Sequence, residues 1–202
     1  MMLAFDLDNT LFSSLNSDYK NYLIACQKLF LKPIPLLDYS YLRKNEGMLV
    51  ICEKTGVNEM DMRNALNENF DETFYLEDEL ILDLQKYLTH LQDSQNIIIT
   101  RRKSKEIAIQ QLKNMNLDYL FEVNHIWSLN NEETASKKAE ILLKFNPSLY
   151  IGDKCSDSDA ARIAGVEFIW VNTGFFCNLC FHERKYTNIN VALDSVFQRS
   201  NG

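Results

Sequence analysis

Two aspartates lie close together near the start of the chain, in the stretch AFDLDNTLF at residues 4–12. Asp6 and Asp8 are separated by one leucine, and Thr10 follows two positions later. The apolar run at residues 3–7 predicts a buried strand, so we expect both carboxylates at its carboxyl end. Residues i and i+2 of an extended segment point to the same side. Such a pair can bind a divalent cation, attack as a nucleophile or transfer a proton.

A plain structural explanation competes with this interpretation of the DxDxT pattern. Asp8, Asn9 and Thr10 could form a surface turn in which the side chains hydrogen-bond the backbone. The pattern alone is weak, because average composition produces it in roughly one chain in fifteen of this length. Its position at the end of a predicted buried strand makes chance occurrence much rarer and favours a functional site.

Further polar residues follow other predicted strands. Thr100 ends the run IIIT, Asp153 follows the run LYIG, and Asp157 lies four residues later, where SDSDAARIAG predicts a helix closed by Gly165. Asp157 could also serve as the N-cap of that helix. Ligands bind at the carboxyl ends of the strands of a parallel sheet, so we expect these groups to gather there. An acidic cluster of this kind requires a hard cation, most simply Mg²⁺.

A lysine is expected beside the acids. SKKAEILLKF predicts a helix from about residue 137, with Ser136 as its N-cap. The buried face of this helix is defined by Ile141, Leu142 and Phe145. Lys138 falls within roughly 15° of the centre of that face, whereas Lys137 falls about 90° away. A lysine centred on an apolar face needs a partner, so we expect Lys138 to reach the acidic site, with Lys137 as the alternative.

Five short apolar runs predict strands, at residues 3–7, 97–100, 125–129, 149–152 and 167–172. Helical patterns of suitable length separate the last four runs. This alternation predicts an α/β fold, a Rossmann-like parallel sheet with helices on both faces. The nearly continuous apolar runs are typical of strands that are buried on both faces.

A long helical insert is expected between the first two strands. The gap is about 85 residues, whereas a crossover between parallel strands needs only a dozen or more. Asn58 is a candidate N-cap within it, and an amphipathic stripe at residues 80–91 leads into the second strand. We predict an α/β core at residues 1–14 and 80–202, and a small all-helical cap at residues 15–79.

Bulk composition narrows the class of protein. The chain has 202 residues, 46% of them hydrophobic, with a net charge of −7 and a pI near 5.0. This balance disfavours binding to nucleic acid or to an anionic membrane. No apolar run is long enough for a membrane span, and no signal peptide is visible, so we expect a cytoplasmic protein.

The five cysteines are odd in number and scattered, so we expect reduced thiols rather than a disulfide framework. Cys177, Cys180 and His182 raise a zinc hypothesis through the CxxC spacing and the nearby histidine. Only three ligands are local, which favours loose or buried thiols over a zinc site.

Together, DLDNTLF, Thr100, Lys138 and GDKCSDSDAARIAG resemble, in order, the four motifs of the haloacid dehalogenase-like (HAD) superfamily. The resemblance covers roughly residues 2–14 and 80–175, and the helical insert is similar to the smaller helical cap of that family. It implies that Asp6 attacks a phosphoryl group to form an aspartyl phosphate. It also implies that Asp8 protonates the leaving oxygen and later deprotonates the attacking water.

The resemblance also implies a metal site and two phosphate-binding groups. Mg²⁺ would be held by Asp6, the backbone carbonyl of Asp8 and Asp153, with Asp157 acting directly or through water. Thr100 would hydrogen-bond a phosphoryl oxygen, and Lys138 would neutralise negative charge on the phosphate and the nucleophile.

The implied function is hydrolysis of a small phosphorylated metabolite, because dehalogenases and ion-pumping ATPases of the superfamily lack an acid at the position of Asp8. A sugar phosphomutase and a catalytically idle binding module are the alternatives. A phospho-receiver domain fits less well, given the DxD spacing and the long insert. Many relatives carry Asn where this chain has Arg101, so Arg101 or Arg102 either contacts the substrate or is surface charge. The ester and the oligomeric state are left open.

Overall fold

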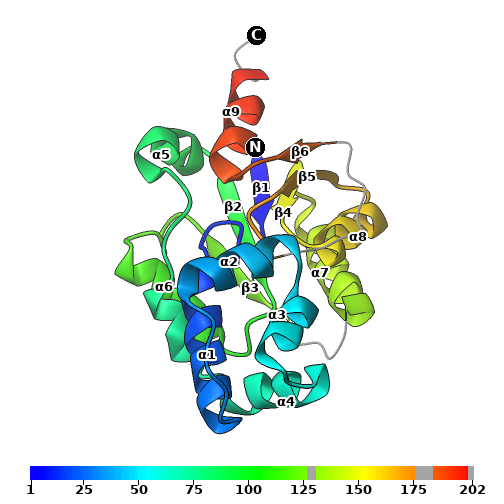
Figure 1. The fold of residues 1–202 in the computed structure, drawn as a ribbon. Helices are drawn as coiled ribbons and strands as arrows, with labels where there is room; N and C mark the ends of the chain where they lie inside the picture. The colour runs from blue at the N-terminus through cyan, green and yellow to red at the C-terminus, as the bar shows by residue number, and fades with distance from the viewer. Residues whose placement is uncertain (127–130, 176–183, 200–202) are drawn as a thin grey trace. The chain divides into compact units, whose positions relative to one another are not determined.

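The computed structural model describes residues 1–126, 131–175 and 184–199. Within them, six strands form one sheet in the order β3-β2-β1-β4-β5-β6, with every neighbouring pair parallel (Figure 1). The strands are β1 Met2–Phe5, β2 Gln95–Thr100, β3 Glu122–His125, β4 Leu149–Gly152, β5 Glu167–Val171 and β6 Lys185–Tyr186. This arrangement confirms the predicted parallel α/β fold.

Helices cover both faces of the sheet. The first face carries α5 Leu84–Gln92, α6 Lys105–Asn114 and α9 Ile189–Arg199, and the second carries α7 Asn131–Phe145 and α8 Cys155–Ala164. Successive strand residues point to opposite faces. In β1, Leu3 and Phe5 therefore join the core under the first set of helices, whereas Ala4 joins the core under the second.

Four of the five predicted strands lie where the apolar runs placed them, give or take two residues. The third was predicted at residues 125–129, but β3 ends at His125, and residues 127–129 lie outside the described part of the chain. Val123 pairs with Ile98 of β2 and packs in the core after the buried Phe121, which sets the earlier register. The two-residue β6 is too short to produce a periodic signal.

Two helix starts differ from the prediction. Helix α7 begins at Asn131, so Ser136 lies inside it and is not its N-cap. Glu132 and Glu133 occupy the first turn, where acidic side chains complement the helix dipole. Helix α5 begins at Leu84, whose N-cap Asp83 accepts a hydrogen bond from the backbone N of Lys86. The first part of the predicted 80–91 stripe therefore precedes the helix.

The chain forms two compact units, one built around the sheet and one formed by residues 14–78 together with Phe175. The second unit contains α1 Leu15–Lys28, α2 Leu36–Asn45, α3 Met48–Thr55, α4 Glu59–Asn69 and the 3₁₀ helix η1 Glu72–Glu77. It has a core of its own, which includes Tyr22, Tyr39 and Ile51. Asn58 caps α4 as predicted, since its side chain accepts a 2.8 Å hydrogen bond from the backbone N of Met60.

The cysteines do not all remain thiols. Cys26 and Cys52 are buried free thiols in the helical unit, but Cys155 is disulfide-bonded, which contradicts the expectation of reduced cysteines throughout. Pairing depends on distances in the fold, which spacing along the chain does not reveal. The candidate zinc residues Cys177, Cys180 and His182 lie outside the described residues. In the described part of the chain, no helix has the length and apolar character needed to cross a membrane.

Candidate active site

The order of the strands brings the predicted site residues together. β1 lies between β2 and β4, and Phe5 is in register with Ile98 on one side and Ile151 on the other. The backbone N of Asp6 extends this pairing with a 2.8 Å hydrogen bond to the carbonyl of Ile151. Asp6 therefore leaves the carboxyl end of β1 between the end of β2, at Thr100, and the end of β4.

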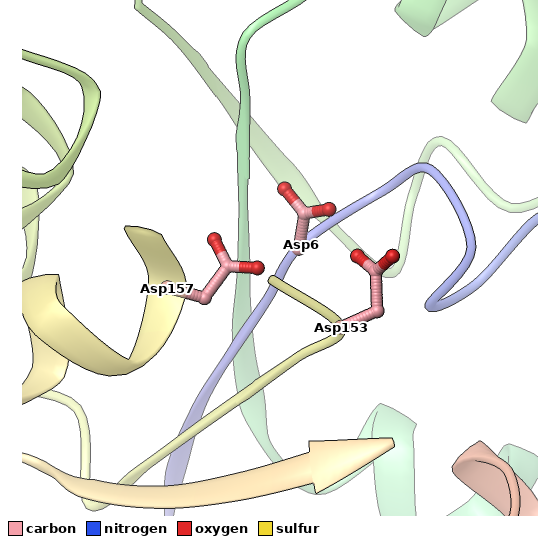
Figure 2. A group of neighbouring side chains, drawn as sticks. All are labelled: Asp6, Asp153 and Asp157. Carbon is pink, nitrogen blue, oxygen red and sulfur yellow. The ribbon is translucent and has the colours of Figure 1, made fainter. Parts of the chain in front are cut away.

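Three carboxylates converge at this edge of the sheet. Asp6, Asp153 and Asp157 each offer an oxygen, and the three oxygens lie within 4.8 Å of one another. Figure 2 shows Asp6 after β1, Asp153 on the segment after β4 and Asp157 at the start of α8, with their carboxylates facing a common space. All three residues are at most 4% exposed. This burial makes their mutual repulsion strong unless cations compensate it.

Lys138 lies among these carboxylates. Its Nζ donates hydrogen bonds of 2.5 Å to Oδ1 of Asp6 and 2.5 Å to Oδ1 of Asp157, and one of 3.2 Å to the hydroxyl of Tyr150. The residue is only 2% exposed. The apolar face of α7 thus carries the lysine into the site.

Lys137, the alternative, lies elsewhere. It forms an ion pair of 2.6 Å with Glu133, one turn earlier on α7, and both side chains are partly exposed. Lys137 and Lys138 differ by about 100° around the helix, which accounts for their different surroundings.

Asp157 contributes to the capping of α8 and also bonds within the site. It occupies the third position of α8, so it is not the N-cap, and its Oδ2 accepts a 3.0 Å hydrogen bond from the backbone N of Lys154. Its Oδ1 also accepts a 2.8 Å hydrogen bond from the hydroxyl of Tyr150. A Cβ on Gly152 would lie 2.6 Å from Oδ2 of Asp157, so the glycine leaves the space that this carboxylate fills.

Burial and charge pull the ionisation of these groups in opposite directions. Burial raises the pKa of Asp6, and the nearby Lys138 does not fully offset that effect. Burial also acts to raise the pKa of Asp157, but the charge and hydrogen bond of Lys138 outweigh it and the pKa is lowered. Burial acts to lower the pKa of Lys138, yet Asp157 and Asp6 outweigh it, so the ammonium keeps its charge.

Asp153 is influenced by the charge of Lys154 but has no hydrogen-bonding partner among the described residues. Its two carboxylate oxygens are buried and accept no hydrogen bond from the described residues. Burial, together with the charges of Asp6 and Asp157, raises the pKa of this carboxyl group well above its ordinary value. Buried carboxylates are normally paired or bound to metal. The unpaired oxygens of Asp153, next to two further carboxylates, therefore fit a hard divalent cation with oxygen ligands.

Gly174 closes the site on the side of Asp153. A Cβ at this position would lie 1.9 Å from Oδ2 of Asp153, a distance that only glycine avoids. The residue follows β5 and was not expected at the site from the sequence. The one available signal was its position just beyond the end of a predicted strand, in VNTG.

Asp8 is paired with Arg102. The Nη2 of Arg102 donates to Oδ1 of Asp8 at 2.6 Å, and Nε lies 3.1 Å from each carboxylate oxygen. Burial acts to raise the pKa of Asp8, but the charge and hydrogen bonds of Arg102 outweigh it and hold the pKa below its usual value. Arg101 is exposed, so of the two arginines it is Arg102 that lies at the site.

The rest of DLDNTLF folds into a tight loop. Asn9 adopts a left-handed conformation with φ of 60°, which asparagine tolerates well. The backbone N atoms of Leu11 and Phe12 donate to the carbonyl of Leu7 at 3.0 and 3.1 Å, and Leu7 itself is fully buried in the core. Thr173 donates a hydrogen bond to the carbonyl of Asn9. The loop thus turns Leu7 inward and leaves Asp6 and Asp8 at the edge of the sheet.

Thr100 ends β2 with a buried hydroxyl, which accepts a 3.2 Å hydrogen bond from the backbone N of Arg102. Tyr150 was not expected at the site from the sequence, because an aromatic residue within a buried strand is normally explained by core packing. Its hydroxyl nevertheless contacts Lys138 and Asp157.

Comparison with known proteins identifies the chain's relatives. The sequence model of a family described as haloacid dehalogenase-like hydrolase matches residues 3–171. A search of curated protein sequences finds no match.

Several solved structures share the fold over nearly their full length. A predicted phosphoglycolate phosphatase from Haemophilus somnus is 17% identical, with a TM-score of 0.67 over 96% of this chain and 97% of the other. Protein tyrosine kinase A from Mycobacterium tuberculosis is 18% identical, with a TM-score of 0.69 over 96% and 97%. A putative beta-phosphoglucomutase from Thermotoga maritima is 14% identical, with a TM-score of 0.61 over 98% of each chain. At these identities the likeness shows the fold alone.

Replacing Asp153 by Asn should stabilise the cation-free protein, because it removes a buried, unpaired negative charge. In EDTA at pH 7 we expect the melting temperature to rise by about 2–4 °C for each kcal/mol of repulsion relieved. The folded-state pKa of Asp153 is raised, so the ionised group costs stability above the unfolded-state pKa. The advantage of the variant should therefore shrink as the pH falls towards about 4.

Thermal melts of Asp153→Asn with and without Mg²⁺ check this expectation. Mg²⁺ should raise the melting temperature of the wild type and leave that of the variant unchanged. Asp159→Asn, which alters an exposed carboxylate of α8, should behave like the wild type. A variant that melts below the wild type in EDTA would contradict the assignment of Asp153.

Replacing Gly174 by Ala should displace the Asp153 carboxylate, because the added methyl group occupies the position of its Oδ2. Overpacking of this kind costs about 1–3 kcal/mol. We expect circular dichroism to show a folded protein, and titration calorimetry to show Mg²⁺ affinity at least about tenfold weaker, or 1.4 kcal/mol. The control is Gly56→Ala in the helical unit, which is strained by the φ of 70° but whose Cβ would meet no atom within 4 Å. Equal Mg²⁺ affinities for Gly174→Ala and Gly56→Ala would refute the role of Gly174.

Proposed function

Because the chain belongs to the haloacid dehalogenase-like hydrolase family, we propose that it is a Mg²⁺-dependent phosphatase acting on a small phosphorylated metabolite. The reaction proceeds through an aspartyl phosphate on Asp6. The observation that carries the proposal is the position of Lys138, whose Nζ bridges Asp6 and Asp157 beside the unpaired carboxylate of Asp153. This arrangement combines a nucleophile, a fixed positive charge and a cation site at one edge of the sheet.

Asp6 is the nucleophile in this proposal. Its Oδ1 accepts the hydrogen bond of Lys138, so Oδ2 is the oxygen that attacks phosphorus. The ammonium of Lys138 limits the repulsion between this carboxylate and the incoming phosphate dianion.

The cation site consists of Asp6, Asp153 and the backbone carbonyl of Asp8, with Asp157 acting directly or through water. When bound there, Mg²⁺ neutralises negative charge on the carboxylates and on the phosphate. The oxygens of Asp153 support this site, because they are buried and accept no hydrogen bond from the described residues.

Thr100 and Asp8 complete the proposed machinery. The hydroxyl oxygen of Thr100 accepts from the backbone N of Arg102, so its hydrogen can be donated to a phosphoryl oxygen. Asp8 gives a proton to the leaving oxygen, and it then takes a proton from the water that attacks the aspartyl phosphate.

The helical unit at residues 14–78 is the cap in this proposal and selects the ester. A phosphomutase would use the same acids and would interconvert isomeric sugar phosphates without net release of phosphate. A catalytically idle binding module would bind the phosphate ester without turning it over. Release of phosphate therefore separates the proposed function from both alternatives.

Phosphate release from a panel of metabolite phosphates tests the proposal. The wild type should release phosphate from at least one ester in Mg²⁺ and lose that activity in EDTA. Asp6→Asn should lower the rate by at least about 10³-fold, since the amide oxygen is a poor nucleophile. Activity that survives either Asp6→Asn or chelation of Mg²⁺ would overturn the mechanism, and the absence of release from every ester would favour the idle module.

Replacing Lys138 by Ala should lower kcat by about 10²–10³-fold, because the variant lacks the charge that faces the nucleophile and the phosphate. It also leaves two buried carboxylates without their partner, which costs about 3–5 kcal/mol of stability. Lys137→Ala is the matched control and should change kcat less than about twofold, because its ion pair with Glu133 is at the surface.

A second variant of Lys138 distinguishes a loss of catalysis from a loss of folding. Lys138→Arg keeps the positive charge, so it should melt closer to the wild type than Lys138→Ala while still losing activity. Circular dichroism and steady-state kinetics on the three variants give both readouts. A larger loss of kcat in Lys137→Ala than in Lys138→Ala would disprove the assignment of the lysine.

A further inference from the structure

The proposed mechanism assigns no task to the residue that contacts Asp8 most closely. Arg102 makes three contacts of 2.6–3.1 Å with the carboxylate of Asp8. It reaches Asp8 from the carboxyl end of β2, 94 residues away along the chain. A buried arginine directed at the proposed proton donor is too specific an arrangement to be explained by surface charge.

Arg102 is anchored at both ends of its side chain. Its backbone N donates to the hydroxyl of Thr100 at 3.2 Å, which fixes the turn after β2. Its Nη1 donates to Oε1 of Gln111 on α6 at 2.7 Å, and Gln111 is 1% exposed. The backbone of Arg102 is therefore fixed at the end of β2, and its guanidinium is also held by α6.

The contacts distinguish the two oxygens of Asp8. Oδ1 accepts from Nη2 at 2.6 Å and also lies 3.1 Å from Nε, whereas Oδ2 shares the Nε contact at 3.1 Å and has no further hydrogen bond from the described residues. A carboxylate bound to a planar guanidinium in this way has little freedom to rotate. Oδ1 is occupied by Arg102, so Oδ2 is the oxygen available to carry a proton.

Direct binding of substrate by Arg102 is the competing explanation. Its side chain is 0% exposed, whereas the side chain of Asp8 is 16% exposed. Arg102 thus lies beneath Asp8 and presents no surface to an incoming phosphate. The geometry favours an effect of Arg102 on the substrate through Asp8.

We propose that Arg102 is a positioning residue that fixes Asp8 so that Oδ2 delivers the proton to the leaving oxygen of a phosphate ester with a poor leaving group, such as an alkyl or sugar phosphate. The inference rests on the proposed function. In the first step, Asp6 forms a bond to phosphorus, the bond from phosphorus to the ester oxygen breaks, and the proton of Asp8 moves to that oxygen. In the second step, water attacks phosphorus, its proton returns to Asp8, and Asp6 leaves as a carboxylate.

This role has a signature that depends on the leaving group. An alkoxide needs a proton as the bond to phosphorus breaks, whereas a nitrophenolate leaves readily without one. The value of kcat/KM reports the steps up to the first irreversible one, which is formation of the aspartyl phosphate. A misplaced Asp8 therefore lowers kcat/KM for alkyl esters far more than for nitrophenyl esters.

The experiment measures kcat/KM for an alkyl phosphate and for p-nitrophenyl phosphate with Arg102→Met, which keeps an unbranched apolar side chain and removes the guanidinium and its charge. We expect a loss of about 10²-fold or more for the alkyl ester, the size of a general-acid contribution. The loss for the nitrophenyl ester should be below about tenfold, because the phosphate-binding groups are unchanged. Arg102→Lys should recover little of the alkyl activity, because an ammonium cannot reproduce the planar two-oxygen contact.

Two further variants make the result specific to Asp8. Arg101→Met, at the exposed neighbouring arginine, should change kcat/KM for either ester by no more than about twofold. In an Asp8→Asn background, Arg102→Met should cause no additional selective loss on the alkyl ester, because the group that it positions can no longer donate the proton.

The possible outcomes separate the explanations. Equal losses of kcat/KM on both esters, with a raised KM, would show that Arg102 binds phosphate. A gain of kcat/KM on the alkyl ester would show that Arg102 restrains proton transfer. Equal losses that follow a lowered melting temperature would show a purely structural role, and each of these results overturns the inference. If the wild type releases phosphate from neither ester class, the proposed function fails, and the inference fails with it. If the wild type is active and only the selectivity for alkyl esters is missing, the inference alone fails.

Discussion

The structure of the site depends on the compensation of buried negative charge. Asp6, Asp153 and Asp157 lie within 4.8 Å of one another at the edge of the sheet, and Lys138 contacts the first and the third at 2.5 Å. Three carboxylates against one ammonium leave two negative charges among these buried groups. In the proposed function a divalent cation supplies the missing charge, and it would bind beside the oxygens of Asp153, which accept no hydrogen bond from the described residues. Lys138 thus compensates part of the negative charge of the site.

Asp6 and Asp8, near the start of the chain, have different partners in the structure. Asp6 has Lys138 from α7, and Asp8 has Arg102 from the end of β2. Arg102 lowers the pKa of Asp8, and in the proposed mechanism this favours the ionised form that acts as the base in the second step. The first step needs the protonated form, and an approaching phosphate dianion raises the pKa of a neighbouring carboxyl group again. One pair of residues can therefore serve both halves of the reaction.

Much of this arrangement could be predicted from the chain. The apolar runs placed most strands, and the strand ends placed Asp6, Thr100 and Asp153 at one edge. The spacing of the apolar residues correctly placed Lys138 on the buried face of α7. The helix starts about six residues earlier than expected, but this did not affect the result, because the buried face is defined by the apolar positions and not by the N-cap. Arg102 and Gly174 could not be assigned in this way. The inward turn of Arg102 depends on Gln111 of α6, and the role of Gly174 depends on the approach of a loop to Asp153.

The central claim is that Asp6 becomes covalently phosphorylated, and trapping of that intermediate tests it most directly. Borohydride reduces an aspartyl phosphate to homoserine, so a reaction quenched during turnover and analysed by peptide mass spectrometry should show homoserine at position 6. The modification should require both substrate and Mg²⁺, and it should be absent from Asp6→Asn. Turnover that continues while position 6 remains unmodified, or a modification at any other aspartate, would contradict the account.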